Sequence, residues 1–443
     1  MNDPSQDGSL VFIPHSTFRI PPSLYDIVDL ITSFRFVTKV SFYRIFLLTV
    51  YLLYPILAFV VTLIVTPLSI VLGHRFRLFD LPDDERKLHK GKIPYTGGLG
   101  FIVAIGISAF AMFYFSRSEL SGGGHTQLVP MFLYSVEACL IIFFLGVWDD
   151  FKDLPFQRKF LFQFIAAFFI ILGAIKSGVF PQVFDMDASG VLINSVGTLV
   201  SVFWIVGTTN AINMIDGMDG LAGGTTLISA LAMASLSLMW GNTVLALVFF
   251  CIAAALFGFL LFNFNPAKVF MGDTGSMFLG FLLGVFGWLM VDSAPPRFTM
   301  FFVPIIVLGV PISDTLLAFF RRIVKRQNPF SADRFHIHHM LKARLGLSVR
   351  STVLLLYALA AFYAGAGITV ALLPEIYAWI CIGALLVAQG FFFHFLGYTE
   401  LVFQEAAESV LLASPQHKTN GVHPPYTNGN GTHTSRSAAK RDS

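Results

Sequence analysis

The stretch Asn210-Ala-Ile-Asn-Met-Ile-Asp-Gly-Met-Asp-Gly220 sets two aspartates, two asparagines and two glycines between two long apolar runs. Neither residues 190–208 before it nor residues 221–262 after it include a charged side chain. A carboxylate at the edge of a bilayer costs free energy unless a cation or a water-filled cavity compensates its charge. The stretch therefore predicts a functional polar loop between two membrane spans.

The composition of the whole chain also indicates a membrane protein. Of its 443 residues, 55% are hydrophobic and 12% are charged, and the mean hydropathy is +0.73. Because soluble domains carry about 25% charged residues, we exclude a soluble protein and predict an all-α, polytopic transmembrane helical bundle. Cys139, Cys251 and Cys381 stand singly in apolar runs, which excludes a disulfide framework and a Cys-x-x-Cys metal site.

Apolar runs of membrane-crossing length predict about eleven spans. They are Ile45–Leu72, Gly97–Phe115, Met131–Val147, Phe160–Ile175, Val191–Gly207, Leu221–Trp240, Val244–Phe262, Met277–Val291, Met300–Phe320, Thr352–Leu373 and Tyr377–Leu396. Residues 44–396 thus form one transmembrane domain. Residues 1–43 form an N-terminal extension in which Ile27–Val40 suits a short interfacial helix, and no cleavable signal peptide is expected there. Residues 397–443 form a tail that we expect to be disordered from about 415, because it lacks apolar periodicity.

Lysine and arginine are unevenly distributed between the loops. One alternating set of loops carries eighteen of them, whereas the other set carries only Arg117, Lys176 and Arg297. The positive-inside rule predicts that the first set is cytoplasmic, with the N-terminus outside and the tail inside. Basic residues of the N-terminal segment argue mildly the other way. Because every distinctive polar cluster falls in the first set, we expect an active-site cleft on the cytoplasmic face.

Carboxylates occur in pairs in two of these loops. Asp149 and Asp150 follow an apolar span directly, and adjacent carboxylates favour a divalent cation or a shared proton because they repel each other. Asp216 and Asp219 are three residues apart and would share one face of a helical turn, while Gly217 would let a ligand approach the backbone. The alternatives are a helix cap, which would need only one aspartate of the first pair, and a plain polar turn for the second.

Asp273 lies in the segment Asn263-Phe-Asn-Pro-Ala-Lys-Val-Phe-Met-Gly-Asp-Thr-Gly-Ser276, immediately before an apolar span. A carboxylate beside glycines suits a hard cation such as Mg²⁺. Phe270 offers an aromatic face and Lys268 a contact for phosphate. In the alternative interpretation, Asp273 only caps the next helix and Phe270 faces lipid.

Two basic segments suit an anionic ligand. The loop from Asp80 to Gly98 includes Lys90 and Lys92 and ends in two glycines, and such a surface suits phosphate oxygens. The tract Asp333-Arg-Phe-His-Ile-His-His339 suggests zinc at first, but an arginine among imidazoles favours an anion instead. For the loop from Asp80 to Gly98, the alternative is an ordinary basic loop that anchors the topology. For the histidine tract, the alternative is a solvated basic loop.

With these five clusters in this order, residues 45–350 resemble the polyprenyl-phosphate N-acetylhexosamine-1-phosphate transferases. Within that family they are most similar to the branch that acts on UDP-N-acetylglucosamine, often called WecA/TagO-like. The resemblance implies transfer of sugar-1-phosphate from the UDP-sugar to undecaprenyl phosphate, with release of UMP, as the first step of cell-surface polysaccharide synthesis. It also implies Mg²⁺, with Mn²⁺ as a substitute, a location in the bacterial cytoplasmic (inner) membrane, and a homodimer.

The same resemblance implies roles for individual residues. Asp149 and Asp150 would be catalytic, Asp273 would bind the metal ion, and Phe270 would stack on uracil. The substrate-binding residues that it implies are Lys90 or Lys92, Asn213, Asp216, Gly217, Met218, Asp219, Phe270, Arg334, His336, His338 and His339.

Two other functions remain as alternatives. The related transferase of peptidoglycan synthesis, which uses UDP-MurNAc-pentapeptide, has three consecutive histidines, whereas Ile337 interrupts the run here, so a GlcNAc donor is favoured. A cation or solute transporter would place its acids at the bilayer midplane, whereas these acids lie at span ends. The residues leave open whether transfer takes one step or proceeds through a covalent aspartyl intermediate.

Overall fold

The computed structural model describes residues 52–80, 92–116, 125–178, 191–324, 326, 328 and 336–398. Within these residues the only strands are a short antiparallel pair, β1 (Phe79–Asp80) and β2 (Ile93–Pro94). All other regular elements are helices, which confirms the predicted all-α class. The predicted interfacial helix Ile27–Val40 and the tail beyond Tyr398 lie outside the described residues.

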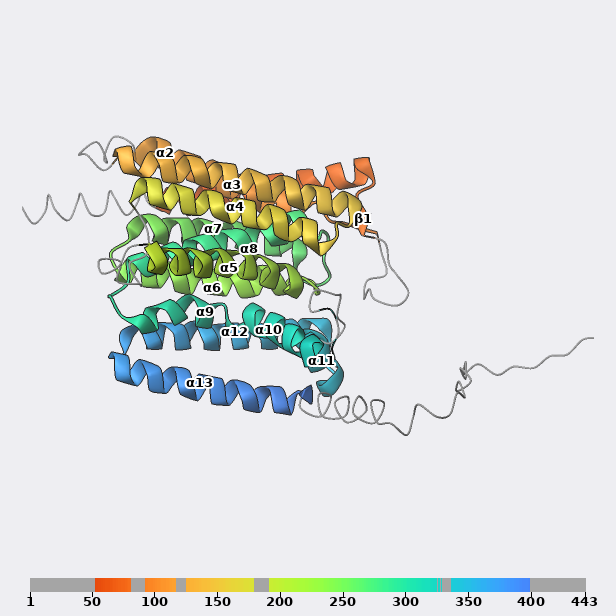
Figure 1. Cartoon of the computed structure of the whole chain (residues 1–443). Coiled ribbons are helices and arrows are strands. Elements are labelled where there is room, and N and C mark those ends of the chain that lie inside the picture. Colours follow the sequence, from red (N-terminus) through yellow and green to blue (C-terminus); the bar gives the residue numbers. More distant parts are fainter. Residues whose placement is uncertain are drawn as a thin grey trace, which may run out of the picture.

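The helices run roughly parallel to one another in a layered bundle (Figure 1). The first is Leu52–Phe76. It is followed by α2 (Gly98–Ser116), α3 (His125–Lys152), α4 (Phe156–Ser177), α5 (Val191–Ile215), α6 (Leu221–Met239), α7 (Thr243–Asn263), α8 (Gly272–Asp292), η1 (Phe298–Phe301), α9 (Phe302–Val307), α10 (Gly309–Val324), α11 (Ile337–Leu345), α12 (Val349–Leu372) and α13 (Glu375–Phe395).

The span count agrees with the sequence in all but one place. In the described part of the chain, ten helices are long and apolar enough to cross a membrane, or up to eleven if one bent pair is a single span. That pair, Phe298–Val307 with Gly309–Val324, replaces the predicted continuous span Met300–Phe320 and is bent by 88°. The prediction of one uninterrupted helix there was therefore wrong.

Proline explains this break. Pro311 has no N–H, so it cannot donate to the carbonyl of Val307 four residues earlier, and its ring crowds that carbonyl. The Val307 carbonyl instead accepts a hydrogen bond from the hydroxyl of Ser229 on α6 (2.9 Å). A side chain of a neighbouring helix thus satisfies the backbone group that the proline leaves unpaired.

Helix α8 is the centre of the bundle. In the most apolar 18-residue stretch of α8, 94% of the residues are buried. The same measure is 11% for α13, which lies at one side of the bundle (Figure 1). Small residues let its neighbours approach closely: a Cβ at Gly280 would lie 2.8 Å from the Cα of Thr209 on α5, and one at Gly146 on α3 would lie 2.4 Å from the Cα of Thr274. The packing of α3 and α5 against α8 brings their ends to its first turn.

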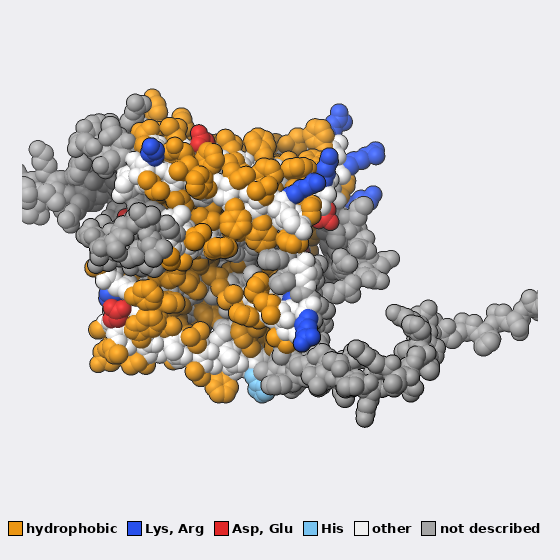
Figure 2. Space-filling model, in the orientation of Figure 1, with side chains coloured by type: hydrophobic (Ala, Val, Ile, Leu, Met, Phe, Trp, Pro, Cys, Tyr) orange, Lys and Arg blue, Asp and Glu red, His pale blue; other side chains and the backbone are white. Residues whose placement is uncertain are grey.

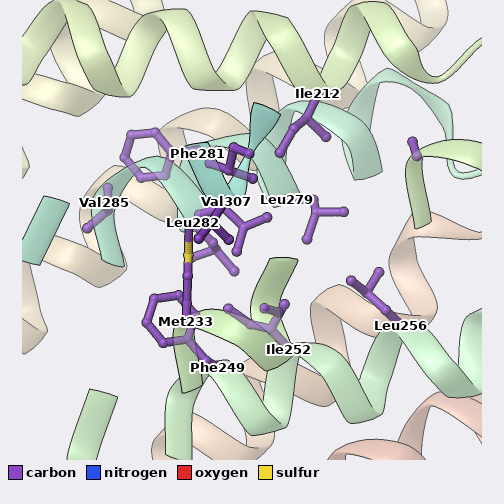
Figure 3. Close-up of a cluster of buried hydrophobic side chains, with 14 of the residues drawn as sticks. Ile212, Met233, Phe249, Ile252, Leu256, Leu279, Phe281, Leu282, Val285 and Val307 are labelled. Carbon is purple, nitrogen blue, oxygen red and sulfur yellow. The ribbon is translucent and has the colours of Figure 1, made fainter. Parts of the chain in front are cut away.

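The core beside α8 is apolar and continuous. Figure 3 shows side chains from five helices meeting there, among them Ile212 of α5, Met233 of α6, Phe249 of α7, Leu279 of α8 and Val307 of α9. The outer surface is apolar as well. In Figure 2 hydrophobic side chains cover the middle of the visible face, and most of the visible Lys and Arg atoms lie at the right-hand end, where Figure 1 places β1 and α11.

Candidate active site

The end of α3 and the start of α8 are joined by Asp150. One carboxylate oxygen accepts the backbone N–H of Asp273 (2.7 Å), and the other accepts the N–H of Thr274 (3.0 Å) and its hydroxyl. Gly272, which precedes Asp273, has a φ of +70°, and a Cβ there would lie 2.4 Å from the Tyr95 carbonyl and 3.0 Å from both Asp150 oxygens. Glycine is thus required for the turn that brings Asp273 to Asp150.

Asp273 is oriented by Asn213, at the end of α5. The Asn213 amide donates to Oδ1 of Asp273 (2.6 Å) and to the hydroxyl of Ser276 (2.8 Å). Within the described residues, Oδ2 of Asp273 has no hydrogen-bond partner. The predicted metal ligand therefore has one oxygen fixed by an amide and the other available for a ligand.

Asp149 lies beside this group in a separate set of contacts. Its Oδ1 accepts the backbone N–H of Leu154 (2.8 Å), and its Oδ2 forms an ion pair with Lys159 of α4. Only 2% of Asp149 is exposed. Both members of the predicted Asp-Asp pair are thus held by the protein, Asp150 by the start of α8 and Asp149 by α4.

The loop between α5 and α6 contains the second pair of carboxylates. The pKa of Asp216 is raised to about 8, mainly because the side chain is buried. The negative charges of Asp273, Asp150 and Asp219 contribute to the same rise. Asp219 itself accepts hydrogen bonds from the Asn265 amide (2.9 Å) and the Ala267 N–H (3.0 Å). Asp216 therefore lies near enough to Asp273 and Asp150 to be affected by their charges, while Asp219 ties the loop to the segment after α7.

The histidine tract meets this same loop. His338, at the start of α11, is 2% exposed, and a Cβ at Gly217 would lie 2.8 Å from its Nε2. Within the described residues neither ring nitrogen of His338 has a hydrogen-bond partner. Buried polar atoms without partners are uncommon, so this ring is suited to receive a ligand at the exposed Gly217. The rings of His336 and His338 are parallel with centroids 5.6 Å apart, and His339 lies beyond them, 4.2 Å from His338.

One predicted contact is not supported by the geometry. The N–H groups of Gly97 and Gly98 donate to the carbonyls of Phe270 and Met271 (2.9 and 3.1 Å), so they are not available for phosphate oxygens. A Cβ at Gly98 would lie 2.6 Å from the Cα of Gly275, which shows that this glycine is needed for close packing against α8. The interpretation of the Gly-Gly pair as a phosphate contact was therefore wrong.

The remaining predicted residues are only partly placed. Phe270 is half-buried, and its N–H donates to the carbonyl of Pro94 in β2 (2.8 Å). Met218 is buried in the loop, and Lys92 is exposed next to β2. Lys90 and Arg334 lie outside the described residues.

Three site residues were missed by the sequence interpretation. Thr274 donates to Asp150, Lys159 pairs with Asp149, and Asp314 of α10 accepts from His336 (2.7 Å). Asp314 could have been found, because it is the only acidic residue in the predicted span Met300–Phe320, and acids within spans are usually functional. Lys159 follows the Asp-Asp pair by nine residues, and nothing in the sequence pattern assigned it to Asp149.

Carboxylates, amides and imidazoles thus gather at one end of a membrane-spanning helical bundle. This combination suits a membrane enzyme that handles charged substrates. Comparison with known proteins identifies the family. The sequence profile described as glycosyl transferase family 4 matches residues 132–291.

Relatives over most of the chain carry consistent names. A probable undecaprenyl-phosphate N-acetylglucosaminyl 1-phosphate transferase of Bacillus subtilis is 37% identical over 306 residues, which are 68% of this chain and 81% of the relative. An undecaprenyl-phosphate alpha-N-acetylglucosaminyl 1-phosphate transferase of Salmonella typhi is 28% identical over 70% of this chain and 81% of the relative. A decaprenyl-phosphate N-acetylglucosaminephosphotransferase of Mycolicibacterium smegmatis is 32% identical over 68% and 77%. The chain belongs to glycosyl transferase family 4, and it is a multi-pass membrane enzyme of the phosphotransferase type.

Proposed function

We propose that the protein transfers N-acetylglucosamine-1-phosphate from UDP-N-acetylglucosamine to undecaprenyl phosphate. An oxygen of the lipid phosphate forms a bond to the phosphorus that carries the sugar, and the bond from that phosphorus to the UMP oxygen breaks. The products are UMP and a lipid diphosphate sugar. The names of the Bacillus and Salmonella relatives give the same acceptor, undecaprenyl phosphate, and the same transferred group, N-acetylglucosaminyl 1-phosphate.

The observation that supports this function best is the meeting of three helices at Asp273. Asp150 of α3 holds the backbone of Asp273, and Asn213 of α5 holds its carboxylate. Joining two phosphate anions requires that their charge is balanced and that the reactants are held in line. A fixed carboxylate, a neighbouring lysine and buried imidazoles within one region meet both needs.

Mg²⁺ fits this arrangement. Within the described residues, no three His, Cys, Asp or Glu side chains are close enough to enclose a metal ion. Mg²⁺ in transferases is commonly held by one or two carboxylates together with substrate phosphates and water, so a complete protein cage is not required. Asp273 would hold the ion, and bound Mg²⁺ would neutralise the diphosphate and stabilise the leaving UMP.

The structure suggests different tasks for the two adjacent aspartates. Asp150 uses both oxygens to hold the first turn of α8, so we assign it to positioning Asp273. We assign the acceptor phosphate to the pair of Asp149 and Lys159, where the lysine supplies a positive charge and the aspartate orients it. If Asp149→Asn kept turnover near that of the wild type, this assignment would be wrong.

The reaction is tested by measuring UMP release from purified protein in detergent with Mg²⁺ and undecaprenyl phosphate. UDP-GlcNAc, UDP-GalNAc and UDP-MurNAc-pentapeptide are compared in parallel, with Asp273→Asn as the inactive control. Lipid-dependent UMP release from UDP-GlcNAc alone supports the proposal. UMP release from one of the other donors would identify that donor as the substrate instead. If the folded protein released no UMP from any donor, the proposed function would be rejected.

A direct transfer is favoured over a covalent route, because both Asp149 and Asp150 are already hydrogen-bonded or ion-paired within the protein. A covalent aspartyl phosphate would allow labelled UMP to exchange into UDP-GlcNAc without lipid. We expect no exchange until undecaprenyl phosphate is added, and exchange without lipid would establish the two-step route.

We also propose that the site faces the cytoplasm, where the UDP-sugar is made. The loops that contribute to the site belong to the set rich in lysine and arginine. A cysteine introduced at the exposed Lys268, in a variant whose native cysteines are replaced, should react with a membrane-impermeant maleimide only in inside-out vesicles. Labelling in right-side-out vesicles alone would reverse the orientation.

A further inference from the structure

Asp314 is a buried acid that neither the sequence motifs nor the family name assign. It lies on α10, just after the bend from α9, and only 1% of it is exposed. A buried carboxylate costs free energy unless its oxygens are hydrogen-bonded. Its two oxygens are both used at the same place, the start of α11.

The first contact is to a histidine ring. Oδ2 of Asp314 accepts from Nδ1 of His336 at 2.7 Å. A carboxylate can only accept, so the proton lies on Nδ1, and the orientation of the ring is fixed. This leaves Nε2 of His336 as the nitrogen that can meet a ligand.

The second contact is to the backbone. Oδ1 of Asp314 accepts the N–H of Ile337, the first residue of α11, at 2.6 Å. His336, which precedes the helix, supplies no side-chain cap. A nine-residue helix is marginal in isolation, and a carboxylate at its N-terminus stabilises it. Asp314 therefore acts as the cap of α11 from another helix.

The position of α11 decides where His338 lies. His338 follows Ile337 directly, its ring is parallel to that of His336, and its Nε2 occupies the space beside Gly217. The link from Asp314 to the loop between α5 and α6 thus passes through two histidines and requires no direct contact between Asp314 and a substrate.

We propose that Asp314 is a positioning residue of the transfer reaction. It fixes the Nδ1–H form of His336 and seats α11, so that the two imidazoles face the donor substrate at Gly217. The expected effect on the reaction rate rests on the transferase function proposed above. The positioning of α11 by Asp314 can be tested without measuring turnover.

The first experiment changes which ring nitrogen of His336 carries the proton, while the side chain at position 314 keeps its size and shape. In Asp314→Asn the amide oxygen can still accept from Ile337, but the amide NH₂ faces Nδ1 and forces the His336 proton to Nε2. We expect kcat/KM for UDP-GlcNAc to fall at least tenfold with little change in melting temperature. A matched control is Thr315→Val, because within the described residues the buried Thr315 hydroxyl has no hydrogen-bond partner; its activity should stay within twofold of the wild type.

A double-mutant cycle shows whether Asp314 acts through His336. Asn in place of His336 keeps a donor near Nδ1 but lacks Nε2. If the proposal holds, Asp314→Asn costs less than about twofold in the His336→Asn background. An equal loss in both backgrounds, or a single Asp314→Asn variant within twofold of the wild type, overturns it. Asp314→Glu, which keeps the charge on a longer side chain, replaces Asp314→Asn in the cycle if the latter does not fold.

Hydrogen–deuterium exchange tests the seating of α11 independently of activity. In Asp314→Ala we expect amide exchange in residues 337–345 to accelerate at least tenfold, with the exchange of α12 unchanged; Thr315→Val should alter neither. Unchanged exchange in α11 would overturn the anchoring role. A wild-type protein that releases no UMP from any donor would reject the transferase function, while the exchange result would still decide the anchor.

Discussion

The carboxylate of Asp150, at the end of α3, accepts the backbone N–H of Asp273, at the start of α8, at 2.7 Å. An acid of one helix thus caps another helix, and the residue that it holds is the predicted metal ligand. Because α8 is the most buried of the candidate spans, this contact joins the site to the centre of the fold. Asp150 therefore contributes to both stability and geometry.

Replacing Asp150 by asparagine should destabilise the protein. The amide NH₂ would face an N–H donor of α8, and an unpaired buried donor costs about 1–3 kcal/mol. The matched control is Asp153→Asn, because Asp153 is exposed at the end of the same segment and a surface change costs within about 0.5 kcal/mol. Thermal unfolding in detergent measures both variants, and equal melting temperatures would show that the cap is unimportant.

Asn213 should tune metal binding without contacting the ion. Its amide fixes Oδ1 of Asp273, and loss of such a supporting hydrogen bond typically lowers metal affinity about 10–100-fold. We expect Asn213→Ala to need correspondingly more Mg²⁺ for half-maximal UMP release, and chelation with EDTA to stop the wild-type reaction.

The control for this titration is Asn210→Ala, one turn earlier on α5. Asn210 donates to Gln163 and to the Val206 carbonyl instead of to Asp273. Its Mg²⁺ requirement should match that of the wild type. The same Mg²⁺ dependence for Asn213→Ala and the wild type would remove Asn213 from the metal site.

Much of the fold follows from the apolar pattern alone. Long uncharged runs such as 221–262 favour helices in a membrane, because a helix pairs its own backbone groups where lipid offers no partner. The pattern failed at Met300–Phe320, where the composition is apolar but Pro311 interrupts the hydrogen bonds. Hydropathy measures transfer to lipid and does not register a missing N–H.

The site was predicted as a set of residues, but not as a set of contacts. Sequence distance could not show that Asp150 would reach α8, or that His338 would lie on Gly217. Those contacts depend on which helices pack together, and that is determined by small residues such as Gly146 and Gly280 at the interfaces. Asp314 was missed because it stands alone in its span, whereas the other acids occur within recognisable motifs.

His338 should make the protein sensitive to acid. Burial lowers the pKa of His338 to about 3, below its usual value of 6.5. Between these values the unfolded chain binds a proton that the folded protein excludes, so stability is complete above pH 6.5 and is lost as the pH falls. The loss approaches about 1.4 kcal/mol per pH unit.

His338→Gln should flatten this dependence between pH 7.5 and 5, as measured by urea or thermal unfolding in detergent. The exposed His74 provides the control, and His74→Gln should keep the wild-type slope. If both variants followed the wild-type curve, His338 would not be the group responsible for acid sensitivity.

Gly224 should tolerate no side chain while Tyr357 is present. A Cβ at Gly224 would lie 1.9 Å from Cζ of Tyr357 on α12, and the Tyr357 hydroxyl donates to the Gly220 carbonyl at 2.6 Å. The ring can move away only by breaking this bond, so we expect Gly224→Ala to cost about 1–3 kcal/mol. Gly106→Ala is the control, because nothing lies within 4 Å of its Cβ position.

The cause of this cost can be separated from helix propensity by a second substitution. In a Tyr357→Ala background the three nearest atoms, which all belong to the Tyr357 side chain, are removed, so Gly224→Ala should become neutral or slightly stabilising, as alanine is in a helix interior. Because Gly220 belongs to the loop that holds Asp216 and Asp219, the single Gly224→Ala variant should also raise the KM for the UDP-sugar more than it lowers kcat. A stability cost that persists without the Tyr357 ring would place the constraint elsewhere, for example at Leu260, whose side chain lies near Gly223 on the same helix.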